Sequence, residues 1–227
     1  MKVIVTGATG MVGQGVLREC LLDPGVTQVV TLGRAKTGLV HPKLGEIEHK
    51  DFTDFSSLQK QLAGYDACFY CMGVSSAGMS EEDYRHITYD FTLALARMLA
   101  PLNPGMTFTY VTGAGTDSTA KGSIMWARVK GATENALLAL PFKGAYMFRP
   151  GLIQPLDGAV PRNKWLKGLL VVFKPLFPPL MALFPRHVTT TRRIGRAMIK
   201  VAREGAPSER LEARDINDLG KVEKEET

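Results

Sequence analysis

The sequence predicts an α/β protein with a doubly wound, mostly parallel β-sheet and a small C-terminal lobe. Short apolar segments alternate with helix-like segments over residues 1–150. The strand-like segments are apolar along their whole length, which is typical of parallel sheets covered by helices on both faces. The chain has 227 residues, of which 45% are hydrophobic and 22% charged. This length and composition fit one soluble globular domain with an appendage, and they exclude a disordered chain or a disulfide miniprotein.

The expected elements follow from side-chain periodicity. Strands are expected at the apolar segments Lys2–Thr6, Thr27–Leu32, Glu46–Lys50, Asp66–Met72, Met106–Thr112 and Gly144–Arg149. Helices are expected where apolar residues recur every three or four positions, at Met11–Leu22, Ser56–Ala63, Glu81–Ala100, Gly122–Leu140 and Thr189–Arg203. Prolines at 24, 101 and 141 follow three of these helices and should end them.

The composition changes after Arg149-Pro150-Gly151, where prolines and basic residues become frequent. We therefore expect a first domain over residues 1–155, a smaller lobe over 156–220 and a frayed polar tail over 221–227. The segment from Val160 to Arg203 contains ten Lys or Arg residues and no acidic residue. Such a segment suits an anionic partner such as a nucleic acid, an anionic lipid or a phosphorylated ligand. No nucleic-acid-binding motif accompanies it, so we expect no nucleic acid.

The stretch Trp165–Phe184 is mostly apolar but contains Lys167, Lys174 and three prolines. A membrane-spanning helix needs about twenty mostly apolar residues without such breaks. Two interpretations remain open. The stretch could line the cleft of a small-molecule substrate, or it could bring residues 160–203 into peripheral contact with an anionic membrane surface.

A glycine-rich motif joins the first expected strand to the first expected helix. In this position Gly7 permits a tight turn, Gly10 lets a pyrophosphate approach the backbone, and Gly13 lets the helix pack closely on the strand. The N–H groups at the start of the helix favour phosphate oxygens. The motif predicts a dinucleotide site, with an empty glycine turn as the alternative. Its candidate residues are Thr6, Gly7, Thr9, Gly10, Met11, Val12 and Gly13.

The end of the second expected strand indicates which nucleotide is bound. Enzymes that prefer NAD usually have a carboxylate there, whereas this chain has Gly33-Arg34. The planar guanidinium of Arg34 can pair with a 2′-phosphate, which predicts NADP over NAD unless Arg34 is only a solvated surface residue. Asp51-Phe52 follows the third strand, where Asp51 could bind the adenine amino group or cap the next helix.

These segments together resemble the extended, atypical short-chain dehydrogenase/reductase superfamily, in its NAD(P)-dependent epimerase/dehydratase-like branch. The resemblance covers roughly residues 1–155. It rests on TGATGMVG at 6–13, GR at 33–34, DF at 51–52, CMG at 71–73 and RPG at 149–151. It implies a Rossmann fold, with Gly73 on the adenosine side of the cofactor and Pro150-Gly151 beside the nicotinamide.

The resemblance also implies an active site, and this chain departs from it at one position. The family uses a Tyr-x-x-x-Lys pair and a Ser or Thr at the end of the fifth strand. Here Lys130 and Thr112 match, but Trp126 occupies the tyrosine position. An indole N–H donates a hydrogen bond but cannot act as a general acid near neutral pH. Asp117, on the preceding loop, is the candidate substitute acid, or else a simple cap.

Two functions are therefore open. The first is an NADP(H)-dependent oxidoreductase of atypical mechanism, in which Lys130 holds the ribose while Thr112 and Trp126 polarise a small apolar substrate. The second is a catalytically silent NADPH-binding sensor or a membrane- or partner-associated regulator. The four histidines form no metal-like pattern with each other or with cysteine, so we expect no metal. Three cysteines and a start unlike a signal peptide predict a cytoplasmic location.

Overall fold

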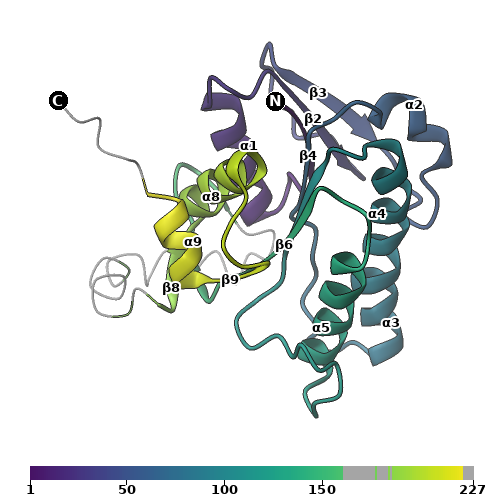
Figure 1. Cartoon of the computed structure of the whole chain (residues 1–227), viewed down its shortest axis with the longest axis vertical. Coiled ribbons are helices and arrows are strands. Elements are labelled where there is room, and N and C mark those ends of the chain that lie inside the picture. Colours follow the sequence, from purple (N-terminus) through teal and green to yellow (C-terminus); the bar gives the residue numbers. More distant parts are fainter. Residues whose placement is uncertain (161–176, 178–183, 185, 222–227) are drawn as a thin grey trace.

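The predicted parallel sheet is confirmed by the computed structural model, which describes residues 1–160, 177, 184 and 186–221 (Figure 1). Seven parallel strands lie in the order β3-β2-β1-β4-β5-β6-β9. They are β1 (Lys2–Thr6), β2 (Gln28–Gly33), β3 (Leu44–Glu48), β4 (Ala67–Tyr70), β5 (Thr107–Val111), β6 (Gly144–Arg149) and β9 (Arg210–Glu212). The strand order reverses between β1 and β4, where ligands bind in such sheets. A second, two-stranded sheet pairs β7 (Leu152–Gln154) with β8 (Val188–Thr190).

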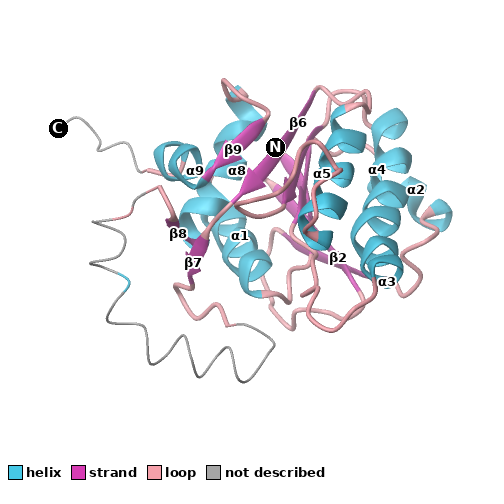
Figure 2. Cartoon of the chain, turned by 90° about the horizontal axis from the view of Figure 1, so that it is seen from below, coloured by secondary structure: helices cyan, strands magenta, loops and turns pink. Residues whose placement is uncertain are grey.

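Helices cover both faces of the large sheet (Figures 1 and 2). One layer contains α2 (Gln59–Leu62), α3 (Glu81–Arg85), α4 (Phe91–Leu102) and α5 (Met125–Leu138). The other contains α1 (Met11–Leu22), α8 (Thr191–Glu204) and α9 (Ala213–Leu219). Alternate residues of β1 enter different cores, because Ile4 packs under α4 while Val3 and Val5 pack under α1 and α8. Burial of both faces explains why the strands are apolar throughout.

Two expected helices differ from the prediction in their regularity. The expected helix at 56–63 is a 3₁₀ turn (Ser56–Leu58) followed by the short α2. Between α3 and α4 the chain makes a π-helical turn, His86–Asp90, and the helix continues past Pro101 to Leu102. Pro101 lies in the last turn of α4, and only Leu102 follows it in the helix. Its missing N–H therefore removes a hydrogen bond only at the very end of the helix.

The residues after 186 are built into the main body of the protein. Strand β9 extends the large sheet beside β6, and α8 packs along α1. Thr190 caps α8, since its hydroxyl accepts a hydrogen bond from the Arg193 N–H at 3.0 Å. The expected boundary at residue 155 therefore does not separate these residues from the sheet. Strand β9 was not predicted from the sequence, because a three-residue strand has too few positions to show an alternating pattern. Helix α9 was not predicted either.

The contact between α1 and α8 depends on two glycines. A Cβ at Gly15 would lie 2.5 Å from the Thr191 Cβ, and one at Gly195 would lie 3.1 Å from the Val16 Cα. The two backbones can approach this closely only because neither residue has a side chain. A Cβ at either glycine would force α1 and α8 apart.

We expect Gly15→Ala to lower the free energy of unfolding by about 1–2 kcal/mol. Overpacking costs about 1–3 kcal/mol, and the gain in helix propensity returns only about 1 kcal/mol of it. Urea titration followed by circular dichroism measures the change. The control is Gly105→Ala, because a Cβ there meets no atom within 4 Å. Equal stability of the two variants would contradict the close-contact explanation.

Candidate functional site

The glycine loop has the backbone geometry that a dinucleotide requires. Gly7 has φ of +67°, a conformation that residues with a Cβ rarely adopt. A Cβ there would lie 2.7 Å from the backbone of Cys71, and a Cβ at Gly13 would collide with the Gly7 carbonyl oxygen. In contrast, a Cβ at Gly10 would meet only the Gly7 oxygen, at 3.2 Å. Only that one contact restricts the space in front of Gly10, and the residues present fit a pyrophosphate held against bare backbone.

The first turn of α1 presents its N–H groups to this space. Gly10 is the N-cap residue and no side chain caps the helix, so the N–H groups of Met11, Val12 and Gly13 face the loop without a partner in the helix. A helix end of this kind favours phosphate oxygens. Thr6 is fully buried at the end of β1, and its hydroxyl has no partner among the described residues.

On the adenosine side, Arg34 is exposed and forms no ion pair within the described part of the chain. The loop that carries it is anchored by Glu46, whose carboxylate accepts hydrogen bonds from the Thr37 N–H (2.7 Å) and hydroxyl (2.5 Å). One oxygen of the Glu46 carboxylate is therefore committed to this loop. Gly73, which follows β4, is exposed and has open space around it.

The structure gives Asp51 a local role. Its carboxylate accepts hydrogen bonds from the Thr53 N–H (2.8 Å) and hydroxyl (2.5 Å). Asp54 accepts from the Ser56 N–H, so Asp54 sits at the start of the following helical turn. Phe52 is buried and packs edge-on against Phe55. Asp51 remains exposed, and its turn holds it at the edge of the sheet.

At the other end of the edge, α5 and the ends of β5 and β6 come together. The Lys130 Nζ on α5 donates a hydrogen bond to the Thr112 carbonyl oxygen at 3.0 Å. The Thr112 hydroxyl donates to the Phe148 carbonyl at 3.2 Å. The Ala114 N–H donates to the Pro150 carbonyl at 2.9 Å, which joins the loops after β5 and β6. A Cβ at Gly151 would collide with the His187 carbonyl oxygen, so β7 can lie against β8 only with glycine there.

Trp126 lies one helical turn before Lys130. Its indole packs against the loop after β5, where a Cβ at Gly115 would lie 3.7 Å from the ring. Gly115 has φ of +84°, so this close loop conformation also depends on glycine. The indole N–H has no hydrogen-bond partner among the described residues and is free to donate.

Burial changes the acidity of Lys130. It lowers the pKa of the ammonium from 10.5 to about 8, and Glu134 on the next turn of α5 offsets only part of this effect. The ring of Tyr110 lies 6.0 Å from the Lys130 Nζ, so the amine is close to an aromatic ring as well as a carbonyl. Near neutral pH the ammonium form still dominates.

The contacts of Asp117 argue against its use as a substitute acid. Its carboxylate accepts four hydrogen bonds, from the Thr119 hydroxyl (2.7 Å) and from the N–H groups of Thr119, Lys121 and Gly122. The Thr119 hydroxyl and the Gly122 N–H lower the pKa of Asp117, which keeps it ionised and unable to give a proton at neutral pH. These contacts agree with the alternative interpretation, in which Asp117 only caps its own loop.

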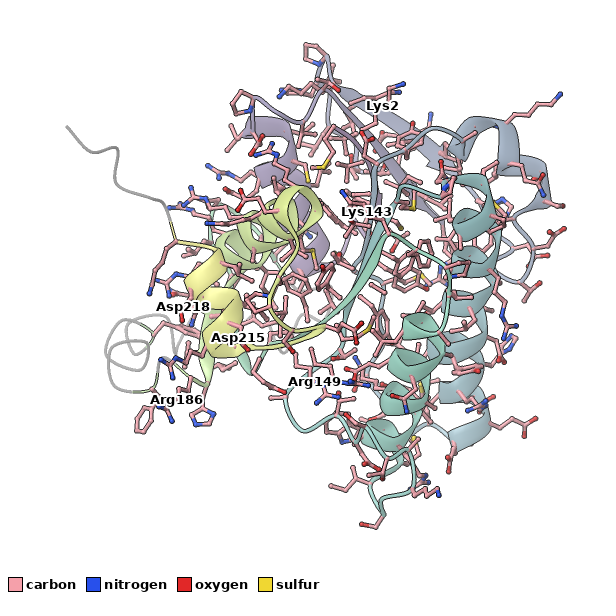
Figure 3. All side chains as sticks on the ribbon, in the orientation of Figure 1. Lys2, Lys143, Arg149, Arg186, Asp215 and Asp218 are labelled. Atoms are coloured by element: carbon pink, nitrogen blue, oxygen red, sulfur yellow. The ribbon has the colours of Figure 1, made fainter. Side chains whose placement is uncertain are left out.

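An ion pair between Glu134 and Arg149, which the sequence pattern did not reveal, lies beside the site. Glu134 is fully buried, and Arg149 at the end of β6 donates to its carboxylate from Nε (2.9 Å) and from Nη2. Arg149, which lies between β9 and α5 in Figure 3, also donates to the Ser118 hydroxyl (2.6 Å) and to Glu212 on β9. One sequence feature could have drawn attention to Glu134. It follows Lys130 by four positions, and a helix places two such residues on the same face.

Most of the described arginines in the basic segment are ion-paired. Arg192 binds Asp157 through two hydrogen bonds (3.0 and 2.7 Å), Arg196 binds Glu19 (2.8 Å), and Arg203 binds Asp23. The stretch Trp165–Phe184 lies, apart from two residues, outside the described residues. In the described part of the chain, no helix is long and apolar enough to cross a bilayer, and no three His, Cys, Asp or Glu side chains converge as metal ligands would.

A side pocket of about 480 Å³ borders the glycine loop. It lies between Thr9, the outer side of α1, the loop after β2 and residues 156–159. The Gln14 amide connects two of its walls, because Nε2 donates to the carbonyls of Thr9 (3.0 Å) and Val160 (3.1 Å). The chain that leads into residues 161–176 is thus tied to the glycine loop.

Comparison with known proteins agrees with this geometry. Residues 3–119 match the NAD dependent epimerase/dehydratase family. Protein fmp52-2, mitochondrial, of Aspergillus oryzae is 27% identical over 226 residues, which cover 96% of each chain. Protein HTATIP2 of Rattus norvegicus is 25% identical over 67% of this chain and 62% of its own. The Bordetella bronchiseptica enzyme WbmF, solved in complex with NAD+, has a TM-score of 0.66 at 19% identity, covering 96% of this chain and 76% of its own.

The expected cytoplasmic location is contradicted by these relatives. The fmp52 proteins of Aspergillus oryzae and Scheffersomyces stipitis are both named mitochondrial, the latter being 28% identical over 67% of each chain. The three cysteines are free, which excludes a disulfide framework. A low cysteine count, however, does not identify a compartment, and this is why the prediction was wrong.

We expect Glu134→Gln to lower the free energy of unfolding by about 3–5 kcal/mol, because it leaves the mostly buried Arg149 guanidinium without its main counter-charge. The matched control is Glu81→Gln, which breaks the surface pair with Arg128 (2.6 Å) and should cost less than about 1 kcal/mol. Chemical denaturation of both variants measures the difference. Similar losses in the two variants would show that the buried pair has no special role.

Proposed function

The chain belongs to the NAD dependent epimerase/dehydratase family, and on this premise we propose that it is an NADP(H)-dependent oxidoreductase acting on a small apolar carbonyl or alkene compound. The observation that carries the proposal is the contact of Lys130 with the Thr112 carbonyl, at the same sheet edge as the open glycine loop. When bound, the nicotinamide would supply hydride transfer. The remaining chemistry belongs to side chains of this protein.

The proposed cofactor site extends along the carboxyl edge of the sheet. The pyrophosphate would lie against the loop from Thr6 to Gly13, and the 2′-phosphate beside the exposed Arg34. Asp51, Phe52 and Gly73 would border the adenosine. Lys130 would hold the nicotinamide ribose. The nicotinamide ring itself would lie beside Pro150 and Gly151.

Exposed apolar side chains on the segments after three adjacent strands support an apolar compound. Val74, Ile124 and Leu152 are each more than a third exposed, and they lie on the segments that follow β4, β5 and β6. Exposed apolar side chains on three adjacent segments suit an apolar ligand. The free indole N–H of Trp126 would donate to a substrate oxygen. The Thr112 hydroxyl would assist by turning from the Phe148 carbonyl.

A second function, a silent NADPH-binding sensor or regulator, has one observation in its favour. Trp126 replaces the family's tyrosine, and Asp117 is committed to its own loop. A cofactor site without an efficient acid would bind NADPH and report it through residues 155–160, which Gln14 ties to the glycine loop. The membrane or protein partner of such a regulator would meet residues 160–203.

We expect NADPH to bind more tightly than NADH, and Arg34→Ala to remove most of the difference. A charge-assisted contact contributes about 1.5–3 kcal/mol, which is about ten- to a hundredfold in affinity. Isothermal titration calorimetry with both nucleotides measures it. Lys60→Ala, an exposed cation on α2, is the control and should leave both affinities unchanged. Equal affinity of the wild-type protein for NADH and NADPH would refute the proposed specificity.

We expect Trp126→Tyr to increase the reduction of simple aldehydes, ketones or quinones, with little change in NADPH affinity. The substitution restores a phenol beside Lys130, and general acid catalysis typically contributes about 10²–10⁴ in rate. Loss of NADPH absorbance over a substrate panel measures turnover of both proteins. Brisk wild-type turnover that collapses in Trp126→Tyr would refute the sensor and show that the indole belongs to the working site.

A further inference from the structure

Three side chains that could replace the missing tyrosine cannot release a proton near neutral pH. Asp117 is held ionised by four hydrogen bonds, and the indole of Trp126 does not ionise. Tyr110 is fully buried in the core, and burial raises its pKa well above the usual value. The Lys130 ammonium, in contrast, lies at the carboxyl edge of the sheet and contacts the end of β5.

We propose that Lys130 is itself the proton donor of this site, in place of the missing tyrosine. The proposal rests on the oxidoreductase function proposed above and narrows its substrate to a carbonyl compound. As hydride from NADPH adds to the carbonyl carbon, the C=O π bond breaks and the N–H proton of Lys130 moves to the oxygen. The products are an alcohol, NADP+ and a neutral amine, which regains its proton from water.

The position of Lys130 suits this role. Its Nζ donates one hydrogen bond within the described structure, to the Thr112 carbonyl, which leaves two of the three ammonium hydrogens for other acceptors. It extends from α5 one turn after Trp126, so the indole N–H and the ammonium lie on the same helix face. The two donors could converge on one substrate oxygen, with the indole binding the oxygen and the ammonium protonating it.

The charges around Lys130 keep its proton transferable. Glu134 follows on α5, but its carboxylate is bound by Arg149 of β6, so it stabilises the ammonium only in part. Tyr110 of β5 presents a neutral ring to the Lys130 ammonium. Burial also raises the pKa of Tyr84 on α3, which interacts with Tyr110. No carboxylate contacts Nζ among the described residues. Burial therefore prevails and brings the pKa of Lys130 to about 8.

The pH dependence follows from this pKa. Reduction needs the ammonium form, which is present below the pKa and is lost as the pH rises through it. The kcat/KM for reduction should therefore be level at pH 6–7 and fall above pH about 8. A lysine with an ordinary pKa would keep its proton to about pH 10.

The test compares Lys130→Met and Lys130→Arg with the wild-type protein, using NADPH and the probe 4-nitrobenzaldehyde. Both substitutions should reduce kcat/KM by about 10²–10⁴. Arginine keeps the positive charge but does not release a proton, so it separates proton donation from simple positioning of the ribose. Lys121→Met, at an exposed lysine just before α5, is the control and should leave turnover unchanged.

A second measurement is independent of turnover. In protein labelled with ¹³C at lysine Cε, the resonance missing from Lys130→Arg should titrate near pH 8. A Lys130→Arg variant as active as the wild type would overturn the role of Lys130 and leave the oxidoreductase intact. Titration of Lys130 near pH 10 would do the same. A wild-type protein that reduces no carbonyl would overturn the proposed function together with this step.

Discussion

The buried ion pair between Glu134 and Arg149 is the interaction on which the assembly of the site depends. It joins the middle of α5 to the end of β6, and through Ser118 and Glu212 it also holds the loop after β5 and strand β9. Removing one partner of a buried pair leaves an uncompensated charge, so the arrangement tolerates little displacement. Lys130 is carried on the same helix one turn earlier, and the pair thus fixes where its amine meets Thr112.

A second constraint is the absence of a side chain at three glycines, which fixes the position of α1. Gly13 lets the helix touch the Gly7 carbonyl, and Gly15 and Gly195 let it touch α8. The helix is therefore held from both sides by close contacts that depend on glycine. Its first N–H groups point at the open space before Gly10. The C-terminal residues contribute to this geometry through α8, although they lie almost two hundred residues away in sequence.

Local patterns were sufficient to predict the fold of residues 1–150, because each strand and helix there shows its own periodicity. The glycine spacing likewise indicated where backbone must approach backbone. What the sequence could not show depends on distant partners. Arg192 and Arg196 count as surplus positive charge in sequence, whereas in the structure they bind Asp157 and Glu19. Strand β9 exists because β6 offers it hydrogen bonds, and its three residues carry no pattern of their own.

The same dependence on distant partners decides the chemistry of the site. Glu134 lies one turn from Lys130, and a free carboxylate at that distance would hold the ammonium strongly and keep its pKa high. Arg149, which comes from another element, takes both carboxylate oxygens. One carboxylate cannot fully neutralise two cations in a buried site, and the planar guanidinium is the better partner. Burial therefore remains the largest influence on the pKa of Lys130, and the packing of α5 against the sheet makes this amine acidic enough to donate.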